Sequence, residues 1–332
     1  MRIFVYEFVT GGGIADLVPE VSLVHEADLM VRALLGDLAD APGVEVFTAR
    51  HPSLPPLRGV QQIVPWPDEP PLELYSRALA SADAAWPIAP ETDGVLERLA
   101  RQTLDLRKHL LGSPPDAVRT AASKSATEIV LRDAGVPVVP TFSNAGEIPE
   151  LPGRWVVKPD DGAGCAGTRQ VASARLAREA LENAPGRLVA QPWLDGEPLS
   201  LSLICDQGQA VLLAGNRQRV RISDGRIRLT GLAVNATFDR LADLAGIAGR
   251  VASAMPALWG YVGVDLVSTR HGPVVLEVNP RLTTSYCGLR EALGVNVAEL
   301  VLQLARDGTM RTPPVPALTG RMVELELEPV PG

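Results

Sequence analysis

Three oxygen-bearing side chains, Asp265, Glu277 and Asn279, lie on two strand-like segments close together in the sequence. The segment Tyr261–Ser268 is apolar and β-branched apart from its aspartate, and Val274–Asn279 carries the other two residues among valines and a leucine. The few residues between the segments include a glycine and have the composition of a hairpin turn. The pattern therefore predicts a β-hairpin that carries carboxylate and amide oxygens.

A hairpin symmetric about His271 places Asp265 directly across from Glu277, and Asn279 shares their face because strand side chains alternate. Two carboxylates that face each other repel and destabilise a strand pair. Nothing cationic stands beside the pair in this register. The opposite face is expected to be anchored in the core by Leu266, Leu276 and Val278.

A divalent cation would turn this repulsion into attraction, because Asp, Glu and Asn oxygens are ligands that Mg²⁺ prefers, with phosphate oxygens completing its shell. The alternative is a hairpin whose outer face is simply solvated. Arg281, two residues beyond the hairpin, adds a fixed cation and favours a metal–phosphate centre. The repulsion also predicts that Glu277→Gln leaves folding intact or slightly improved.

The chain has 31 lysine and arginine residues together, and only Lys108, Lys124 and Lys158 are lysines. Such a bias suggests that lysine is kept where a compact ammonium is needed. Lys124 falls in the first turn of a helix that Ser123 or Thr120 can cap, where the helix dipole disfavours a cation. It is either an exposed lysine tolerated at that cost or one that points at an anion.

Lys158 lies on the strand Arg154–Pro159, directly before a glycine-rich loop. Gly162, Gly164 and Gly167 allow this loop to present successive backbone N–H groups to phosphates. The order differs from a P-loop, because the lysine precedes the glycines. A strand lysine followed by a glycine loop indicates triphosphate binding.

The next strand, Arg187–Leu194, contains Pro192 near its exit, which leaves backbone groups unpaired because proline cannot donate to a ladder. An adenine edge could use such groups. Glu197 follows a turn and is either solvated or within reach of ribose hydroxyls. Beyond it, Asn216, Arg217 and Arg219 form either a wet strand face or a contact to a substrate carboxylate or phosphate.

The elements that position these residues suggest an α/β protein. Strands alternate with helices in the first part of the chain, which implies a parallel sheet with helices on both faces. Expected strands are Arg2–Phe8, Val44–Ala49, Ile63–Val64 and Ala82–Pro87, with a helix from Thr92 to about Leu111, and later strands Leu199–Cys205, Ala210–Ala214 and Arg226–Val234. Gly12 belongs to a glycine run after the first strand, where such sheets bind ligands, so we expect a substrate-side loop there.

The segment Gly112–Pro115 has the glycine, serine and proline composition typical of a linker. Three units are therefore predicted: residues 1–114, 115–192 and 193–332. The chain closes with a helix from Asn296 to Ala305 and a proline-rich tail, Thr312–Pro316.

Composition excludes several classes of protein. A net charge of −8 with no basic run argues against nucleic-acid binding, and no apolar run reaches membrane-spanning length. The N-terminus passes directly into a strand without signal-peptide architecture. Three widely spaced cysteines, Cys165, Cys205 and Cys287, are expected to be reduced thiols in a cytoplasmic protein.

Five motifs follow one another along the chain: a lysine at a helix start, the VVKP strand, the glycine loop, the hinge with its acidic residue and the D…E-x-N-P-R hairpin. In this order they resemble the motifs of the ATP-grasp superfamily. The motifs run from about Lys124 to Arg281, and the preceding α/β unit looks like the usual pre-grasp domain. The resemblance implies an ATP-grasp fold with a Rossmann-like N-terminal domain and a nucleotide between two lobes.

The resemblance also implies roles for individual residues. Lys124 and Lys158 would contact ATP phosphates, under a flap formed by Gly162, Gly164 and Gly167. The adenine hinge would be Gln191, Trp193 and Leu194, with Glu197 on the ribose. Asp265, Glu277 and Asn279 would hold Mg²⁺ or Mn²⁺, and Arg281 together with Lys158 would act on the transferred phosphate.

The chemistry implied is activation of a carboxylate by ATP, followed by attack of an amine to form an amide. The sequences MRIFVYEFVTGGG, GNRQ and EVNPRLTTSY further resemble the tyramine–glutamate ligase group, linked to methanofuran-type cofactor synthesis. On that resemblance the substrates are glutamate-like and tyramine-like, and residues near them would be Asn216, Arg217, Arg219, Thr283, Ser285 and Gly12. Homodimers are common in the superfamily, although nothing in this sequence demonstrates one.

Other functions remain open at this point. Another amino-acid or peptide ligase, or an enzyme of the biotin-carboxylase type that uses bicarbonate, would share the fold. A regulatory module that binds ATP without turnover is the non-enzymatic alternative.

Overall fold

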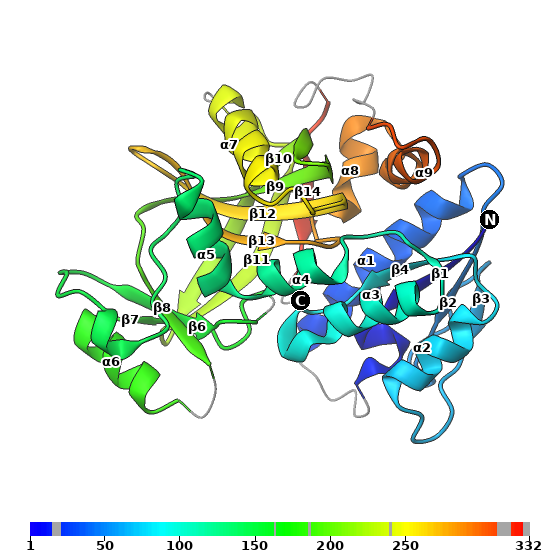
Figure 1. The fold of residues 1–332 in the computed structure, drawn as a ribbon, viewed down its shortest axis with the longest axis horizontal. Helices are drawn as coiled ribbons and strands as arrows, with labels where there is room; N and C mark the ends of the chain where they lie inside the picture. The colour runs from blue at the N-terminus through cyan, green and yellow to red at the C-terminus, as the bar shows by residue number, and fades with distance from the viewer. Residues whose placement is uncertain (15–20, 163, 185–186, 239–240, 311–319, 328–332) are drawn as a thin grey trace.

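The computed structural model describes residues 1–14, 21–162, 164–184, 187–238, 241–310 and 320–327. The predicted tail Thr312–Pro316 lies outside these residues. Figure 1 shows a parallel α/β unit at one end of the molecule and a large curled antiparallel sheet that forms the rest. In the described part of the chain, no helix combines the length and apolar character needed to cross a membrane.

The N-terminal unit is a five-stranded parallel sheet in the order β3-β2-β1-β4-β5. Its strands are β1 (Arg2–Glu7), β2 (Glu45–Ala49), β3 (Gln61–Ile63), β4 (Ala84–Ile88) and β5 (His109–Leu110), with helices α1 (Val21–Ala39), α2 (Pro71–Leu79) and α3 (Val95–Asp105), a π-helical turn η1 (Val9–Gly13) and a 3₁₀ turn η2 (Thr92–Gly94). The central strands β1 and β4 are buried along almost their whole length, which fits their mostly apolar sequences.

One prediction for this unit is wrong, and one helix was missed. The helix expected from Thr92 to Leu111 is a 3₁₀ turn followed by α3, and its last residues form β5 instead. Gly94 begins α3 in the left-handed region (φ 67°), which breaks the expected continuous helix. Helix α2 was not predicted, and helix α4 (Pro115–Ala122) begins within the expected linker, with Pro115 in its first turn.

The second sheet has nine antiparallel strands along the path β13-β12-β9-β10-β11-β7-β6-β8, with β14 also paired to β11. The strands are β6 (Trp155–Pro159), β7 (Arg169–Val171), β8 (Leu188–Pro192), β9 (Gly196–Asp206), β10 (Gln209–Ser223), β11 (Arg226–Val234), β12 (Gly260–Thr269), β13 (Gly272–Asn279) and β14 (Val323–Glu326). The helices are α5 (Lys124–Asp133), α6 (Ala174–Glu182), α7 (Leu241–Ala254), α8 (Tyr286–Leu293) and α9 (Val297–Asp307), with a 3₁₀ turn η3 (Ala145–Glu147).

The sheet divides into two lobes that share few contacts. Strands β6, β7 and β8 with α6 enclose a small core around Trp155, whereas β9, β10, β12 and β13 pack against α7 in a separate core. The lobes are joined where β7 meets β11, through the single register pair Arg169–Arg226. In Figure 1 the small lobe with α6 lies at the lower left, apart from α7.

The N-terminal unit is not independent of the C-terminal end of the chain. Helix α1 shares one apolar core with α8 and α9. A polar contact fixes this docking, because the Asp37 carboxylate accepts hydrogen bonds from Tyr286 Oη (2.6 Å) and Arg290 Nη1 (3.1 Å). The three cysteines are free, as expected.

Candidate active site

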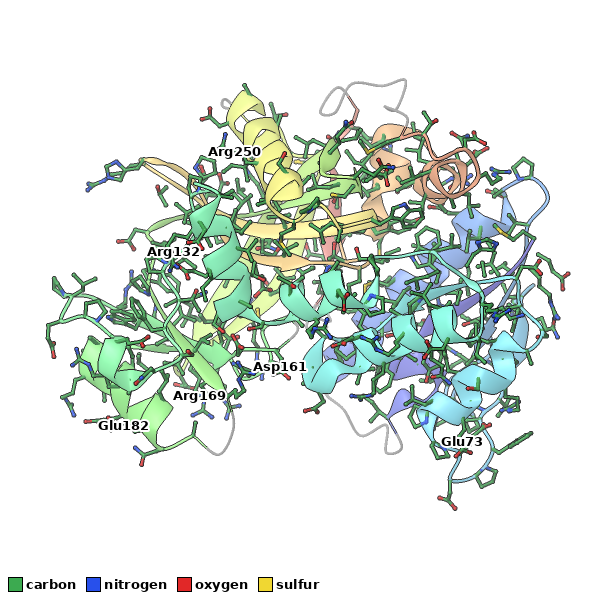
Figure 2. All side chains as sticks on the ribbon, in the orientation of Figure 1. Glu73, Arg132, Asp161, Arg169, Glu182 and Arg250 are labelled. Atoms are coloured by element: carbon green, nitrogen blue, oxygen red, sulfur yellow. The ribbon has the colours of Figure 1, made fainter. Side chains whose placement is uncertain are left out.

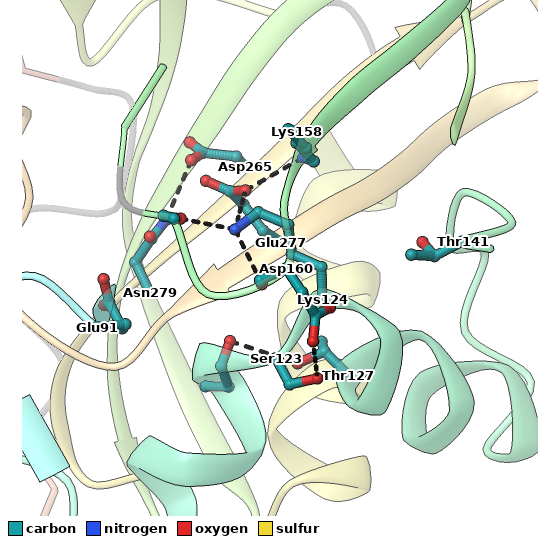
Figure 3. A network of polar contacts seen from close by, with 12 residues as sticks. Glu91, Ser123, Lys124, Thr127, Thr141, Lys158, Asp160, Asp265, Glu277 and Asn279 are labelled. Carbon is teal, nitrogen blue, oxygen red and sulfur yellow. Dashed lines mark hydrogen bonds and ion pairs between the residues drawn. The ribbon is translucent and has the colours of Figure 1, made fainter. Parts of the chain in front are cut away.

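The β12–β13 hairpin pairs Asp265 with Glu277, although not by the symmetry that was expected. The turn pairs Thr269 with Gly272, and if this register continued along the hairpin, Asp265 would lie opposite Leu276 and not opposite Glu277. A β-bulge at Leu276 restores the pairing of the two acidic residues. Bulges of this kind re-aim side chains near functional sites, so the two carboxyl groups lie next to each other in Figure 3.

The bulge also changes which residues anchor the hairpin. Leu266 and Val278 are buried as predicted, but Leu276 is only partly buried and Val275 is fully buried in its place. An inserted residue reverses the alternation of side chains beyond it, which is why the predicted packing of Leu276 is wrong.

Both oxygens of Asp265 receive a hydrogen bond from an amide. Gln218 Nε2 on β10 donates to Oδ1 (2.9 Å), and Asn279 Nδ2 donates to Oδ2 (3.0 Å). The structure thus brings together the three predicted metal ligands and adds Gln218, which had not been singled out. The alternation of the strand was the signal that could have found it, since Asn216 and Gln218 share one face.

Two lysines converge on Glu277, as Figure 3 shows. Lys158 Nζ on β6 lies 3.2 Å from Glu277 Oε2, and Lys124 Nζ at the start of α5 lies 3.6 Å from the same oxygen. The prediction that nothing cationic lies beside the pair is therefore wrong. It considered only the hairpin, whereas both cations come from segments more than a hundred residues earlier.

Burial and these neighbours separate the two acidic groups. Burial and the charge of Glu277 raise the pKa of Asp265 well above its usual range. Burial would also raise the pKa of Glu277, but Lys158 and Lys124 outweigh burial and lower it. The site without ligand therefore holds one fully ionised carboxylate between two ammonium groups, beside a carboxyl that retains its proton more readily.

The position of Lys124 in the first turn of α5 is made tolerable by Asp160. Of the two candidate caps, Ser123 caps the helix, and the Asp160 carboxylate accepts hydrogen bonds from Ser123 Oγ (2.7 Å) and the Ser125 backbone N–H (2.9 Å). A carboxylate at a helix N-terminus offsets the dipole that disfavours a cation there. Lys124 Nζ also donates to the Gly162 carbonyl (2.6 Å), so the lysine points into the site and not into solvent.

The glycine loop lies between β6 and β7, beside the carboxylates. Gly164 (φ 60°) and Gly167 (φ 71°) adopt the left-handed region, and a Cβ on Gly162 or Gly167 would approach Pro159 to 3.0 Å. Burial and then the charges of Glu277 and Asp265 raise the pKa of the Cys165 thiol to about 11, which places this loop close to the acidic pair. Ala163 lies outside the described residues, and contact of the loop with phosphates stays a prediction.

The predicted hinge lies at an edge of the sheet. Among the described residues, strand β8 pairs along its length with β6, and an isolated bridge joins Ala190 to Phe142 on its other side. Gln191 is buried and its Nε2 donates to Thr141 Oγ1 (2.9 Å), a contact that sequence reasoning missed. The Trp193 indole N–H donates to Asp195 Oδ1 (3.0 Å), the Arg154 guanidinium lies over its ring, and Leu194 is half-buried. The adenine contact of this hinge stays a prediction.

Glu197, Arg217 and Arg219 do not lie with the acidic pair. In the register of the sheet, Asp265 pairs with Ser200, whereas Arg217 pairs with Leu199, so Arg217 occupies the opposite face. Its guanidinium lies 2.7 Å from Glu197 and over the ring of Phe238, and Arg219 pairs with Glu324 and Glu326 of β14. The structure therefore does not bring Glu197 or either arginine beside the acidic pair, and the ribose contact of Glu197 and the substrate contacts of the arginines stay predictions.

The remaining predicted substrate residues are divided between the site and its surroundings. Thr283 lies beside Asn279, one of the predicted metal ligands, and Thr283 and Ser285 form a network of hydroxyl groups with Tyr261 and Ser202, at distances of 3.0–3.2 Å. Thr283 approaches so closely that a Cβ on Gly263 would meet it at 2.6 Å.

The face of β9 and β10 that carries Gln218 and points to Asp265 is the inner face. Asn216 shares this face but is fully buried, and its side-chain amide donates to Ser200 and Ser202. Gly12 lies in η1 at the carboxyl end of the parallel sheet, with φ 94° and no room for a Cβ beside Pro65. Its role is therefore first a structural one, and a contact to substrate stays a prediction.

Arg281 contacts a residue that the sequence did not suggest. Its guanidinium forms a two-pronged ion pair with Glu91, which follows β4 in the N-terminal unit: Nε lies 2.8 Å from Oε1 and Nη2 lies 3.1 Å from Oε2. The charges of Glu277 and Asp265 also act on Arg281, which places it near the acidic pair.

The donor set fits a divalent cation and a polyphosphate. Glu277 uses one oxygen for the lysines, and Asn279 donates through its nitrogen, so its Oδ1 is an acceptor for a cation. Carboxylate and amide oxygens suit Mg²⁺ or Mn²⁺, and two lysine ammonium groups within 4 Å of one carboxylate oxygen suit phosphate oxygens nearby.

Comparison with known proteins agrees with this geometry. The sequence model of the ATP-grasp domain family matches residues 121–285, and that of the pre ATP-grasp 3 domain matches residues 44–118. A crystal structure of a putative ATP-grasp superfamily protein from Archaeoglobus fulgidus has a similar fold, with a TM-score of 0.73 and 23% sequence identity over 99% of this chain and 100% of that one.

Two curated relatives carry names of activities. The tyramine–L-glutamate ligase of Methanocaldococcus jannaschii is 29% identical over 229 residues, which cover 69% of this chain and 65% of the relative. A probable α-L-glutamate ligase of Xanthomonas oryzae pv. oryzae is 29% identical over 212 residues, covering 60% of this chain and 70% of the relative. The match thus spans about two thirds of the length of these relatives.

Proposed function

The chain belongs to the ATP-grasp superfamily, and from that premise we propose that it is an ATP-dependent carboxylate–amine ligase. In the proposed reaction a substrate carboxylate oxygen attacks the γ-phosphorus of ATP, the bond to the β-phosphate oxygen breaks, and ADP leaves. An amine nitrogen then attacks the acyl carbon, phosphate leaves, and the amine gives up a proton. The products are an amide, ADP and phosphate.

The observation that carries the proposal is the convergence of Lys124 and Lys158 on Glu277, beside Asp265 and Asn279. Phosphoryl transfer depends mainly on positioning and on neutralising charge that spreads over phosphate oxygens. The two lysines supply fixed positive charge where the lobes meet. Asp265, Glu277 and Asn279 would hold Mg²⁺ or Mn²⁺, which supplies further neutralisation of that charge.

We propose L-glutamate as the acid and tyramine as the amine, which would place the enzyme in methanofuran-type cofactor synthesis. This choice is supported by the curated tyramine–L-glutamate ligases among the relatives. The α-L-glutamate ligases support a second candidate, in which glutamate is joined to an amino acid or peptide. Both candidates use the same ATP and metal chemistry and differ only in the second substrate.

The test is the release of ADP by purified protein with Mg-ATP and glutamate, adding tyramine and then other amines one at a time, with mass spectrometry of the product. Turnover that requires both glutamate and tyramine supports the full proposal. Turnover with another acid and amine keeps the ligase and discards the pathway. Turnover that needs bicarbonate and no amine would indicate a carboxylase, and tight nucleotide binding without any turnover would indicate a regulatory module.

A further inference from the structure

The contact between Glu91 and Arg281 joins the N-terminal unit to the proposed phosphate site across 190 residues of sequence. Both side chains are nearly buried, with exposed fractions of 5% for Glu91 and 12% for Arg281. The geometry is the side-on fork in which each carboxylate oxygen accepts one N–H. Such two-pronged pairs fix the plane of a guanidinium as well as its position.

This arrangement leaves part of Arg281 available. A guanidinium has five N–H donors. Two of them meet Glu91, and Nη1 donates one to the Leu282 carbonyl (3.2 Å). Within the described part of the chain the remaining two N–H groups, one on each terminal nitrogen, have no partner, and a pair of this kind matches two oxygens of a phosphate or acyl phosphate.

The turn that carries Glu91 is itself held from both sides. The Gly94 backbone N–H donates to the Glu91 carbonyl (2.9 Å), which closes the turn. The Asp93 backbone N–H donates to Asp161 Oδ2 (2.9 Å), in the loop that follows Lys158. Figure 2 shows Asp161 at the junction between the small lobe and the N-terminal unit. One turn of the N-terminal unit therefore contacts both the lysine-bearing lobe and Arg281.

Stability alone does not account for a buried ion pair, because the cost of taking both charges out of water often equals or exceeds their attraction. A hydrophobic pair of similar size would hold the units together as well. A fixed orientation of Arg281 is something that only a two-pronged acceptor provides. The separate Asp37–Arg290 contact already docks the N-terminal unit on α8.

We propose that Glu91 is a positioning residue for the ligase reaction, which holds the guanidinium of Arg281 so that two of its N–H groups face the transferred phosphate. The N-terminal unit is then part of the active site. This inference rests on the proposed function for its kinetic test.

The experiment compares Glu91→Asp and Glu91→Gln in the wild-type and Arg281→Lys backgrounds. Aspartate keeps the charge but is one methylene too short for the fork, and glutamine keeps the length but accepts at one atom only. Each is expected to lower kcat by about 10- to 100-fold, because small misplacement of a catalytic group has losses of that size, while the KM for ATP changes less than about threefold. In the Arg281→Lys background the same changes are expected to have almost no further effect.

The matched control is Asp37→Asn, which breaks the other ion pair between the N-terminal unit and the C-terminal part of the chain. It is expected to lower the melting temperature without changing kcat. Equal losses of kcat from Glu91 variants in both backgrounds, or losses matched by Asp37→Asn, would overturn the proposal, because they would indicate a general effect on domain docking.

A second measurement separates this inference from the proposed function. The ratio of Kd for Mg-ADP to Kd for Mg-ATP reports contacts to the γ-phosphate and needs no second substrate. If the wild-type protein turns over no acid–amine pair, the ligase proposal fails, yet Glu91→Asp is still expected to reduce this ratio in the wild-type background and not in the Arg281→Lys background. An unchanged ratio in the wild-type background overturns the positioning role.

Discussion

The inner and outer faces of strands β9 and β10 carry similar residues with opposite surroundings. On the inner face Gln218 donates to Asp265, close to the lysines and Glu277. On the outer face Arg217 pairs with Glu197, and both side chains are nearly half exposed. An ion pair in water contributes little, whereas charges inside a closed site shift each other's pKa and can act on a substrate. Residue type therefore indicates chemistry only when the face is known.

The largest effect is expected from Glu277→Gln on the inner face. Turnover should fall at least about 100- to 1,000-fold, since the proposed metal site loses a carboxylate ligand and with it part of the charge neutralisation at the reacting phosphate. The free energy of unfolding should also fall, by about 3 kcal/mol, because two buried ammonium groups lose their shared carboxylate. This reverses the expectation from carboxylate repulsion alone, under which folding would be unchanged or improved.

Urea denaturation without nucleotide and assays of ADP release measure both quantities. Glu197→Gln on the outer face is the matched control, with both quantities expected to stay near wild-type values. Unchanged or increased stability of Glu277→Gln would mean that the lysines do not compensate the acidic pair.

Lys158→Arg should have the next largest effect, a loss of about 100-fold in kcat. A planar guanidinium cannot replace a compact ammonium 3.2 Å from Glu277 without moving its neighbours. Steady-state kinetics with varied ATP would show it. Lys108→Arg is the control and should leave kcat unchanged, because Lys108 Nζ donates to the Ala82 carbonyl (2.7 Å) in the N-terminal unit, away from the lobes. Equal kcat for both variants would show that Lys158 does not act at the phosphate site.

Gln218→Ala should weaken the apparent affinity for Mg²⁺ about tenfold, because a residue that orients a metal ligand typically contributes that much. The measurement is the Mg²⁺ dependence of turnover at saturating ATP. Gln209→Ala, at the exposed start of the same strand, provides the comparison and should behave as wild type. If both variants keep the wild-type Mg²⁺ dependence, Asp265 does not depend on Gln218 for its orientation.

Arg217→Ala should have the smallest effect, with turnover within about twofold and a loss of stability below about 1 kcal/mol, as for other exposed ion pairs. Measuring the KM for ATP sharpens the contrast between the faces. A large increase in this KM would show that Arg217 and Glu197 approach the nucleotide after all, and that the outer face of β9 and β10 was assigned wrongly.

Much of the fold followed from local patterns. The alternation of apolar strands and helices predicted the parallel N-terminal sheet, and one of the two candidate caps, Ser123, is the residue at which α5 begins. The helix expected from Thr92 to Leu111 failed at both ends, because a 3₁₀ turn ending in the left-handed Gly94 precedes α3 and the chain leaves the helix after Asp105, with Arg107 in the left-handed region (φ 55°). The short parallel strand β5 has only two residues and gives no periodic signal.

The site was predictable where it depended on neighbours along the chain. Asp265, Glu277 and Asn279 share a hairpin, so their shared face could be derived from alternation. The same rule, applied to β10, would have placed Gln218 inside and Arg217 outside, but it needs the register of three strands to say which face is the inner one.

The sequence by itself determined which residues carry charge and metal-binding oxygens, and which of them share a strand face, because strand periodicity is a local property of the backbone. Only the tertiary structure decided that two lysines neutralise Glu277 and that Glu91 holds Arg281. These contacts join segments more than a hundred residues apart, and the packing of two sheets and their helices, not any local preference, sets the distances between them.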